Sequence, residues 1–183
     1  MRSPLLLALV ASLTYACATD NQIFTAVGAH DHEWTLELVE AGQDLEARNE
    51  IGTTPLIFAV FSDNLEGARI LLEHGADPNA RREGPGPSGS ALFSAGDRAM
   101  IDLLLSHGAD LELRDNDGRT ALFWNSTLGN TGVVRELIAV GADVTVRDNR
   151  GNTATAAASA NLLRRPRSDV EALVQLLQQS GAP

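Results

Sequence analysis

The apolar positions between residues 52 and 75 predict two short helices. In each helix the apolar residues recur at helical spacing and form one stripe. The first stripe consists of Leu56, Ala59 and Val60, and the second consists of Ala68, Leu71 and Leu72. A pair of such short helices cannot bury its own apolar face, so further elements are expected to stack against it.

The residues around these stripes predict where each helix begins and ends. Thr54 suits an N-cap, and Pro55 suits the first helical position, where its missing N–H is not needed. Asp63 and Glu66, three residues apart, indicate a capping box for the second helix. Gly75 is expected to end that helix in the left-handed conformation.

The same pattern recurs with a period of 33 residues, which predicts a repeat architecture. Three residue types keep their phase over four copies: a glycine, an aspartate two residues later and an arginine six residues later. They are Gly42, Gly75, Gly108 and Gly141, then Asp44, Asp77, Asp110 and Asp143, then Arg48, Arg81, Arg114 and Arg147. The arginines form either a solvated structural edge, along which neighbouring fingers could make a ladder of Arg–Asp pairs, or an edge that binds an acidic or carboxylate-bearing partner.

The repeated segments resemble the ankyrin repeat. Residues 52–59 and 71–80 carry the resemblance, and residues 117–122 and 137–143 carry it again. It implies an all-α ankyrin-repeat solenoid of about five helix-turn-helix units with short β-turn fingers. The expected repeat domain covers residues 19–183, with units at about 19–48, 49–81, 82–114, 115–147 and 148–183.

Two units depart from the period. In the third unit, residues 83–89 predict a longer, irregular loop, and the stretch from Ala95 to Leu104 is three residues shorter than its counterpart from Ala59 to Leu71. The loop is either an old local realignment or a partner-binding protrusion. In the fifth unit, the cluster Arg164, Arg165 and Arg167 is either a solvated loop or a docking site for an acidic partner.

The first 18 residues predict an export signal. Arg2 precedes an apolar run over residues 5–16 that is too short to span a bilayer, and Ala16–Cys17–Ala18 forms a small-x-small cleavage site. Cys17 leaves lipidation open, as in a bacterial lipoprotein. A buried first helix is the third interpretation. The expected location is the periplasm or the secreted fraction, with a lipid anchor to the bacterial envelope as the alternative, so membrane association depends on Cys17.

The composition and the net charge restrict which classes of partner and which chemistry are expected. The formal net charge is -10 and the chain has no lysine, so it suits neither nucleic acid nor anionic lipid. It suits a soluble monomer or a partner with a basic face. No enzymatic motif is present, and no cofactor is expected. His30, Asp31, His32 and Glu33 form the one dense group of possible metal ligands, but their spacing fits a zinc site poorly, and Asp31 is expected to cap the next helix. His74 and His107 are expected to bond to helix carbonyls.

The ankyrin resemblance implies a partner-binding surface made by the finger tips and the exposed side of the inner helices. By matching positions, it consists of Glu50, Ile51, Thr53, Phe61, Ser62, Asn116, Asp117, Arg119, Trp124, Thr127, Leu128, Asn149, Arg150 and Asn152. Trp124 is expected to be either an anchor for the partner or a core residue.

Together these features predict an exported, periplasmic module for protein–protein interaction that supports or inhibits one protein partner. The alternatives are an immunity protein that neutralises a toxic effector and a secreted, host-directed effector. A metal-binding protein that uses His30 and His32 is a further alternative from a different class.

Overall fold

The computed structural model describes residues 22–84, 88–160 and 167–181, with side chains of the last segment described from Glu171 onward. The predicted export signal, Cys17, Arg164 and Arg165 therefore lie outside the described residues, as do residues 85–87 of the predicted loop. Within the described part of the chain, the secondary structure is helical and no strand forms. One isolated bridge joins Arg147 to Thr153.

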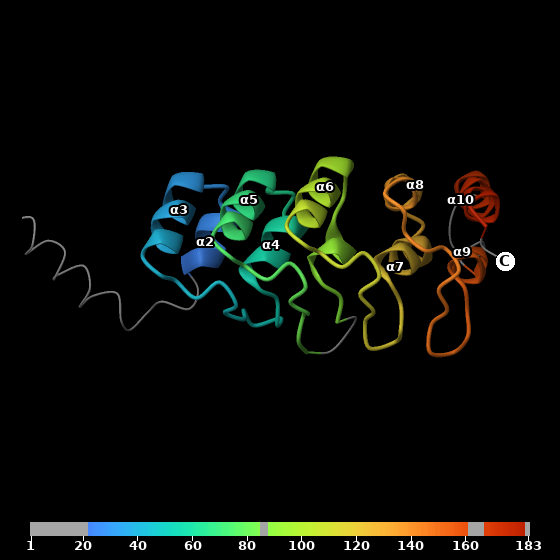
Figure 1. Ribbon diagram of the computed structural model, residues 1–183, viewed down its shortest axis with the longest axis horizontal. Coiled ribbons are helices and arrows are strands. Elements are labelled where there is room, and N and C mark those ends of the chain that lie inside the picture. The colour runs from blue at the N-terminus through green and yellow to red at the C-terminus, as the bar shows by residue number, and fades with distance from the viewer. Residues whose placement is uncertain (1–21, 85–87, 161–166, 182–183) are drawn as a thin grey trace, which may run out of the picture.

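The helices form two parallel rows, an inner row and an outer row (Figure 1). The inner row consists of α2 (Gln22–Gly28), α4 (Pro55–Phe61), the 3₁₀-helix η1 (Ala91–Ser94), α7 (Ala121–Leu128) and α9 (Ala154–Ala160). The outer row consists of α3 (His32–Glu40), α5 (Leu65–Glu73), α6 (Arg98–Ser106), α8 (Thr131–Ala139) and α10 (Arg167–Gln179). Each helix contacts the next in its own row, so the fold is an all-α repeat solenoid, as predicted.

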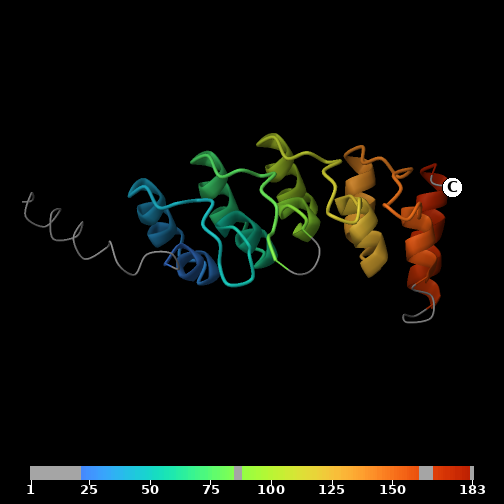
Figure 2. The same cartoon turned by 90° about the horizontal axis from the view of Figure 1, so that it is seen from below.

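One continuous, mainly aliphatic core lies between the two rows of helices. Figure 2 shows the same two rows from below. The largest fully buried side chains of the core come from both rows: Ile23, Val27, Leu56, Leu71, Leu92, Met100, Ile101, Leu104, Leu122, Leu137, Leu173 and Leu177. Stacking of successive units buries these residues, because no single helix pair has enough apolar surface to do so.

Most of the predicted helix boundaries are confirmed. Thr54 Oγ1 accepts a hydrogen bond from Ile57 N at 3.2 Å, and Pro55 is the first residue of α4. Asp31 caps α3 by accepting from Trp34 N at 3.0 Å. Gly75 follows α5 with φ +94°, which a residue without a side chain adopts readily.

The predicted capping box of α5 is wrong by one position. Asn64, not Asp63, is the N-cap, and its Oδ1 accepts from Gly67 N at 2.8 Å. Asp63 instead occupies the left-handed region with φ +55°. Asn64 suits the cap because its amide also donates to Val27 O at 2.8 Å, which ties the second unit to the first.

The predicted ladder of Arg–Asp pairs is also wrong. Arg48 Nη1 donates to the backbone carbonyl of Arg81, and Arg114 Nη1 donates to that of Arg147 at 3.2 Å. Among the described residues, the one ion pair of these arginines joins Arg48 to Glu83 at 3.9 Å. Arg48 and Arg114 therefore each link their finger to the next one through a main-chain carbonyl, whereas Arg147 Nη1 donates to Gly151 O within its own finger at 2.9 Å.

The third unit has a 3₁₀-helix where the other units have a longer inner α-helix. η1 contains 4 residues, whereas α4 contains 7 and α7 contains 8. After Ser94 the chain becomes extended at Ala95, and Asp97 caps α6 by accepting from Met100 N. The three-residue shortening in the sequence thus removes about one turn from the inner row at its centre.

No helix in the described ranges is both long enough and apolar enough to cross a bilayer.

Candidate protein-binding surface

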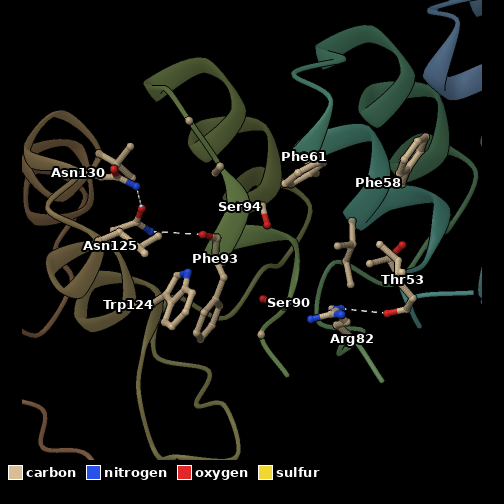
Figure 3. Close-up of a pocket in the computed structure, with 17 residues that line it drawn as sticks. Thr53, Phe58, Phe61, Arg82, Ser90, Phe93, Ser94, Trp124, Asn125 and Asn130 are labelled. Carbon is tan, nitrogen blue, oxygen red and sulfur yellow. Dashed lines mark hydrogen bonds between the residues drawn. The ribbon is translucent and has the colours of Figure 1, made fainter. Parts of the chain in front are cut away.

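A cavity of about 520 Å³ lies where the inner row is interrupted, between α4 and α7 and beside η1 (Figure 3). It opens on the face formed by the inner helices and the bases of the fingers, which we call the inner face. Its described lining consists of Ile51, Thr53, Ile57, Phe58, Phe61, Arg82, Gly89, Ser90, Phe93, Ser94, Ala95, Gly96, Trp124, Asn125, Leu128, Asn130 and Val133. Its volume falls in the range of about 300–1,000 Å³ that is typical of binding pockets.

Exposed apolar side chains gather around the cavity. Among the described residues, four large apolar side chains are exposed, and three of them line it: Phe61 (77% exposed), Ile51 (58%) and Leu128 (36%). The fourth, Leu36, lies on the outer helix α3. Aromatic rings of Phe58, Phe93 and Trp124 extend the apolar surface inward. A contiguous apolar patch on a folded protein usually marks an interaction site.

Hydrogen bonds hold the far wall of the cavity in place. Asn125 Nδ2 donates to Phe93 O at 3.3 Å and to Ala121 O at 3.0 Å, so a buried amide fastens η1 to α7. Asn130 Nδ2 donates to Asn125 Oδ1 at 2.9 Å (Figure 3). The first of these bonds gives the Phe93 carbonyl of η1 a partner on α7, so the side chain of Asn125 holds η1 against α7.

Arg82 is the one charged side chain among the described residues of the lining. Its Nε donates to Ile51 O at 2.9 Å, which holds the guanidinium at the rim. No carboxylate of the described residues forms an ion pair with it. The backbone beside it is tightly packed, because a Cβ on Gly52 would lie 2.0 Å from Glu83 O.

Two buried hydroxyl groups in the lining have no hydrogen-bond partner among the described residues. They are Thr53 Oγ1 and Ser90 Oγ, and both side chains are more than nine-tenths buried. An unsatisfied buried polar group of this kind costs roughly 1–3 kcal/mol of stability. Among the described residues, the lining therefore combines a large apolar surface with one guanidinium that forms no ion pair and two hydroxyls without a hydrogen-bond partner.

The structure divides the predicted partner-binding residues into two groups. The first group lines the cavity: Ile51, Thr53, Phe61, Trp124 and Leu128. Close to it, Glu50 borders a smaller neighbouring hollow with Phe24, and Ser62 ends α4. Thr127 is half-buried, and its hydroxyl donates to Phe123 O at 3.0 Å. Thr53 contributes little exposed surface, because its side chain is buried.

The second group lies on the fingers and takes part in bonds within the chain. Asn149 Nδ2 donates to Asn116 O at 3.0 Å, and Asn149 N donates to Asp117 O at 2.8 Å, which joins two fingers. Asn152 Nδ2 donates to Asp148 Oδ2 at 2.9 Å. Arg150 is exposed at the tip of its finger and donates its backbone N–H to Asp148.

Arg119 is held inside the molecule by three contacts. Its Nη2 lies 2.8 Å from Asp115 Oδ2 and 2.7 Å from Asp117 Oδ2. Its guanidinium carbon also lies 4.8 Å from the centre of the Trp124 ring. Arg119 therefore positions Trp124, whose half-buried ring forms part of the cavity wall and remains accessible from it.

Arg82, Phe58, Phe93, Ser94 and Gly96 line the cavity but are not among the predicted site residues. The signal in the sequence that points to them is the three-residue shortening of the third unit, which removes about one turn from the inner row. The cavity exists because the missing turn exposes side chains of the two neighbouring units, and that effect depends on three-dimensional packing.

The histidines have structural partners. His74 Nδ1 lies 2.8 Å from Ile70 O and His107 Nδ1 lies 2.9 Å from Leu103 O, as predicted for side chains at helix C-termini. His32 Nε2 lies 3.1 Å from Asn64 Oδ1, and Asp31 caps α3. In the described ranges, no three His, Cys, Asp or Glu side chains come together as a metal site.

Comparison with known proteins agrees with this architecture. The family model described as ankyrin repeats (3 copies) matches residues 6–82 and 90–182. The chain is similar to "Putative E3 ubiquitin-protein ligase XBAT34" of Arabidopsis thaliana, with 37% identity over 83 residues, which cover 45% of this chain and 22% of the relative. It is also similar to the B-cell lymphoma 3 protein homolog of Mus musculus, with 37% identity over 82 residues, which cover 44% of this chain and 18% of the relative.

The chain thus spans less than a quarter of the length of these two relatives. The family match covers most of the chain and coincides with the two rows of stacked helices. The chain belongs to the ankyrin-repeat family.

Proposed function

We propose that this protein is an exported ankyrin-repeat module that binds one protein partner through its inner face, at the cavity between α4 and α7. Ankyrin repeats are modules for protein–protein interaction, and that role follows from the family. The specific surface, the export and the effect on the partner are the proposal.

One observation carries the choice of surface. The interruption at η1 leaves Phe61, Ile51 and Leu128 exposed around an apolar cavity. The inner helices α2, α4, η1, α7 and α9 contain no charged residue, whereas the fingers and all five outer helices do. A largely apolar, concave surface in an otherwise acidic molecule favours burial against a partner.

Paired variants test the surface. The tagged protein is used to capture partners from a cell-envelope extract, alongside Leu128→Ser and Leu36→Ser. The two leucines are equally exposed at 36%, but Leu128 lines the cavity and Leu36 lies on the outer row. Loss of a stoichiometric partner with Leu128→Ser alone is the expected result. Equal capture by both variants would contradict binding at the cavity.

The effect of binding on the partner's activity or lifetime distinguishes a supporting role from an inhibiting one. An enzyme partner whose activity or lifetime rises on binding indicates support, and one whose activity falls indicates inhibition. A toxic partner that the protein neutralises would indicate an immunity protein.

The mature N-terminus tests the export. Intact-mass measurement of the protein from its native cell is expected to show a chain that begins at Thr19, the residue after the predicted cleavage site. A lipidated chain that begins at Cys17 would replace soluble export by a lipid anchor. A chain that retains residues 1–18 in the cytoplasm would rule out export.

A further inference from the structure

The chemistry of the cavity lining restricts what enters it. Most of the lining is apolar and aromatic, and Phe61 stands 77% exposed at its edge. A bulky aliphatic or aromatic side chain that entered the cavity would cover Phe61, Phe93 and Trp124 together. A polar or charged side chain placed there would lose its hydration without enough partners to replace it.

Arg82 adds a second requirement: the bound molecule carries a negative charge beside the apolar side chain that enters the cavity. Its Nε is used by Ile51 O, and the rest of its guanidinium fork is left without a carboxylate among the described residues. A guanidinium fixed at one nitrogen presents its remaining N–H groups in a defined direction, which suits a planar carboxylate. Because Arg82 lines the same cavity as the aromatic rings, both requirements fall on one short stretch of the bound molecule.

The surroundings of the cavity favour a protein segment as the occupant. Ile51 and Leu128 extend the apolar surface beyond the cavity on two sides, so residues that flank an inserted side chain also gain contacts. Arg82, which forms no ion pair with the described residues, is positive in a molecule whose net charge is -10. It therefore favours a negative group beside the apolar side chain that enters the cavity.

We propose that the cavity between α4 and α7 anchors a short segment of the partner protein in which a bulky apolar side chain stands beside a carboxylate, the side chain entering the cavity and the carboxylate pairing with Arg82. This inference rests on the proposed function and adds the chemistry of the bound segment to it.

Selection from a random-peptide phage library on the purified protein tests the inference directly. The expected consensus places Leu, Ile, Met, Phe or Trp within one or two residues of Asp, Glu or the free C-terminus. A consensus that lacks the acidic group, a consensus with Lys or Arg in its place, or no enrichment over an unselected library would overturn the inference.

Three variants then assign the contacts, with the selected peptide as the probe and fluorescence anisotropy as the readout. Arg82→Gln is expected to weaken binding by about tenfold or more, and Arg82→Glu is expected to favour the peptide whose acidic residue is replaced by lysine. Gly96→Leu is expected to abolish binding, because Gly96 lines the cavity and a Cβ there meets nothing within 4 Å, so the new side chain has space to fill the cavity.

Gly132→Leu is the matched control, since a Cβ on Gly132 also meets nothing within 4 Å and Gly132 is not part of the lining. Unchanged peptide binding by Gly96→Leu or by Arg82→Gln would overturn the assignment. If Gly96→Leu loses a captured native partner and Arg82→Gln keeps it, the proposed function stands. The pairing of a carboxylate with Arg82 is then the one claim that is rejected.

Discussion

At the scale of single residues, buried polar groups set the geometry of the fingers. The carboxylate of Asp115 is fully buried and accepts hydrogen bonds from the backbone N–H groups of Asp117 and Arg119, while Arg119 Nη2 completes an ion pair at 2.8 Å. The same guanidinium supports the Trp124 ring at 4.8 Å. One buried carboxylate therefore determines both the shape of a finger and the position of one wall of the cavity.

Replacing Asp115 by alanine is expected to lower the free energy of unfolding by about 2–4 kcal/mol, because it leaves two backbone N–H donors without their partner and leaves the largely buried Arg119 guanidinium with only the exposed Asp117 carboxylate. Asp117→Ala is the control. Asp117 is 64% exposed and also pairs with Arg119, so its loss is expected to cost less than about 1 kcal/mol. Urea unfolding measures both, and equal losses would contradict a special role for the buried carboxylate.

Glu112 provides a pH-dependent test. Burial raises the pKa of the Glu112 carboxyl above its ordinary value, and the hydrogen bond from Asp143 N at 2.8 Å offsets only part of that rise. The folded protein therefore holds this proton more tightly than the unfolded chain does. Stability contributed by this group falls as the pH rises from the unfolded pKa through the folded pKa.

Glu112→Gln keeps an oxygen that accepts from Asp143 N and removes the charge. The variant is expected to gain stability relative to the native protein as the pH rises above the ordinary glutamate pKa of about 4.3 and the raised pKa of Glu112 is passed. Urea unfolding at a series of pH values measures the difference. If the free energy of unfolding depends on pH in the same way for the native protein and for Glu112→Gln, burial of Glu112 does not oppose its ionisation.

At the scale of secondary-structure elements, the start of α5 depends on contacts with the preceding unit. Asn64 begins α5 and also donates to Val27 O in α2, while His32 Nε2 lies 3.1 Å from its Oδ1. A cap that bonds to two other helices fixes the spacing between successive units as well as the start of its own helix.

Asn64→Ala is therefore expected to cost about 2–3 kcal/mol, which is more than the typical loss of a helix cap because Val27 O also loses its bond to the Asn64 amide. Asp63→Gly is expected to change stability by less than about 0.5 kcal/mol or to raise it slightly, since glycine adopts φ +55° without strain. Thermal unfolding of both variants distinguishes the observed cap from the predicted one.

The elements that sequence predicts well are those with local causes. Thr54, Pro55 and Gly75 act within their own helices, and each is found in its predicted role. The choice between Asp63 and Asn64, and the partner of Arg48, depend on atoms that lie about one repeat away in sequence. For the same reason, only part of the candidate site could be predicted from the sequence. Phe61 and Trp124 follow from repeat position, but Arg82 and Gly96 become site residues only because η1 is short.

At the scale of the whole molecule, the stacked repeats separate two kinds of surface. The inner row carries no charged residue, whereas the fingers and outer helices carry the charges that give the protein its acidic character. Because each unit contacts only its neighbours, a shortened helix at the centre alters the inner face without disturbing the outer row. A regular scaffold thereby gains one irregular, apolar cavity.

Hydrogen exchange of the purified protein with and without its captured partner tests the central claim most directly. Bound partner is expected to slow exchange in residues 49–53, η1 and α7, which surround the cavity, and to leave the outer helices α3 and α5 unchanged. Slowed exchange confined to the outer row, with no change around the cavity, would contradict binding at the inner face.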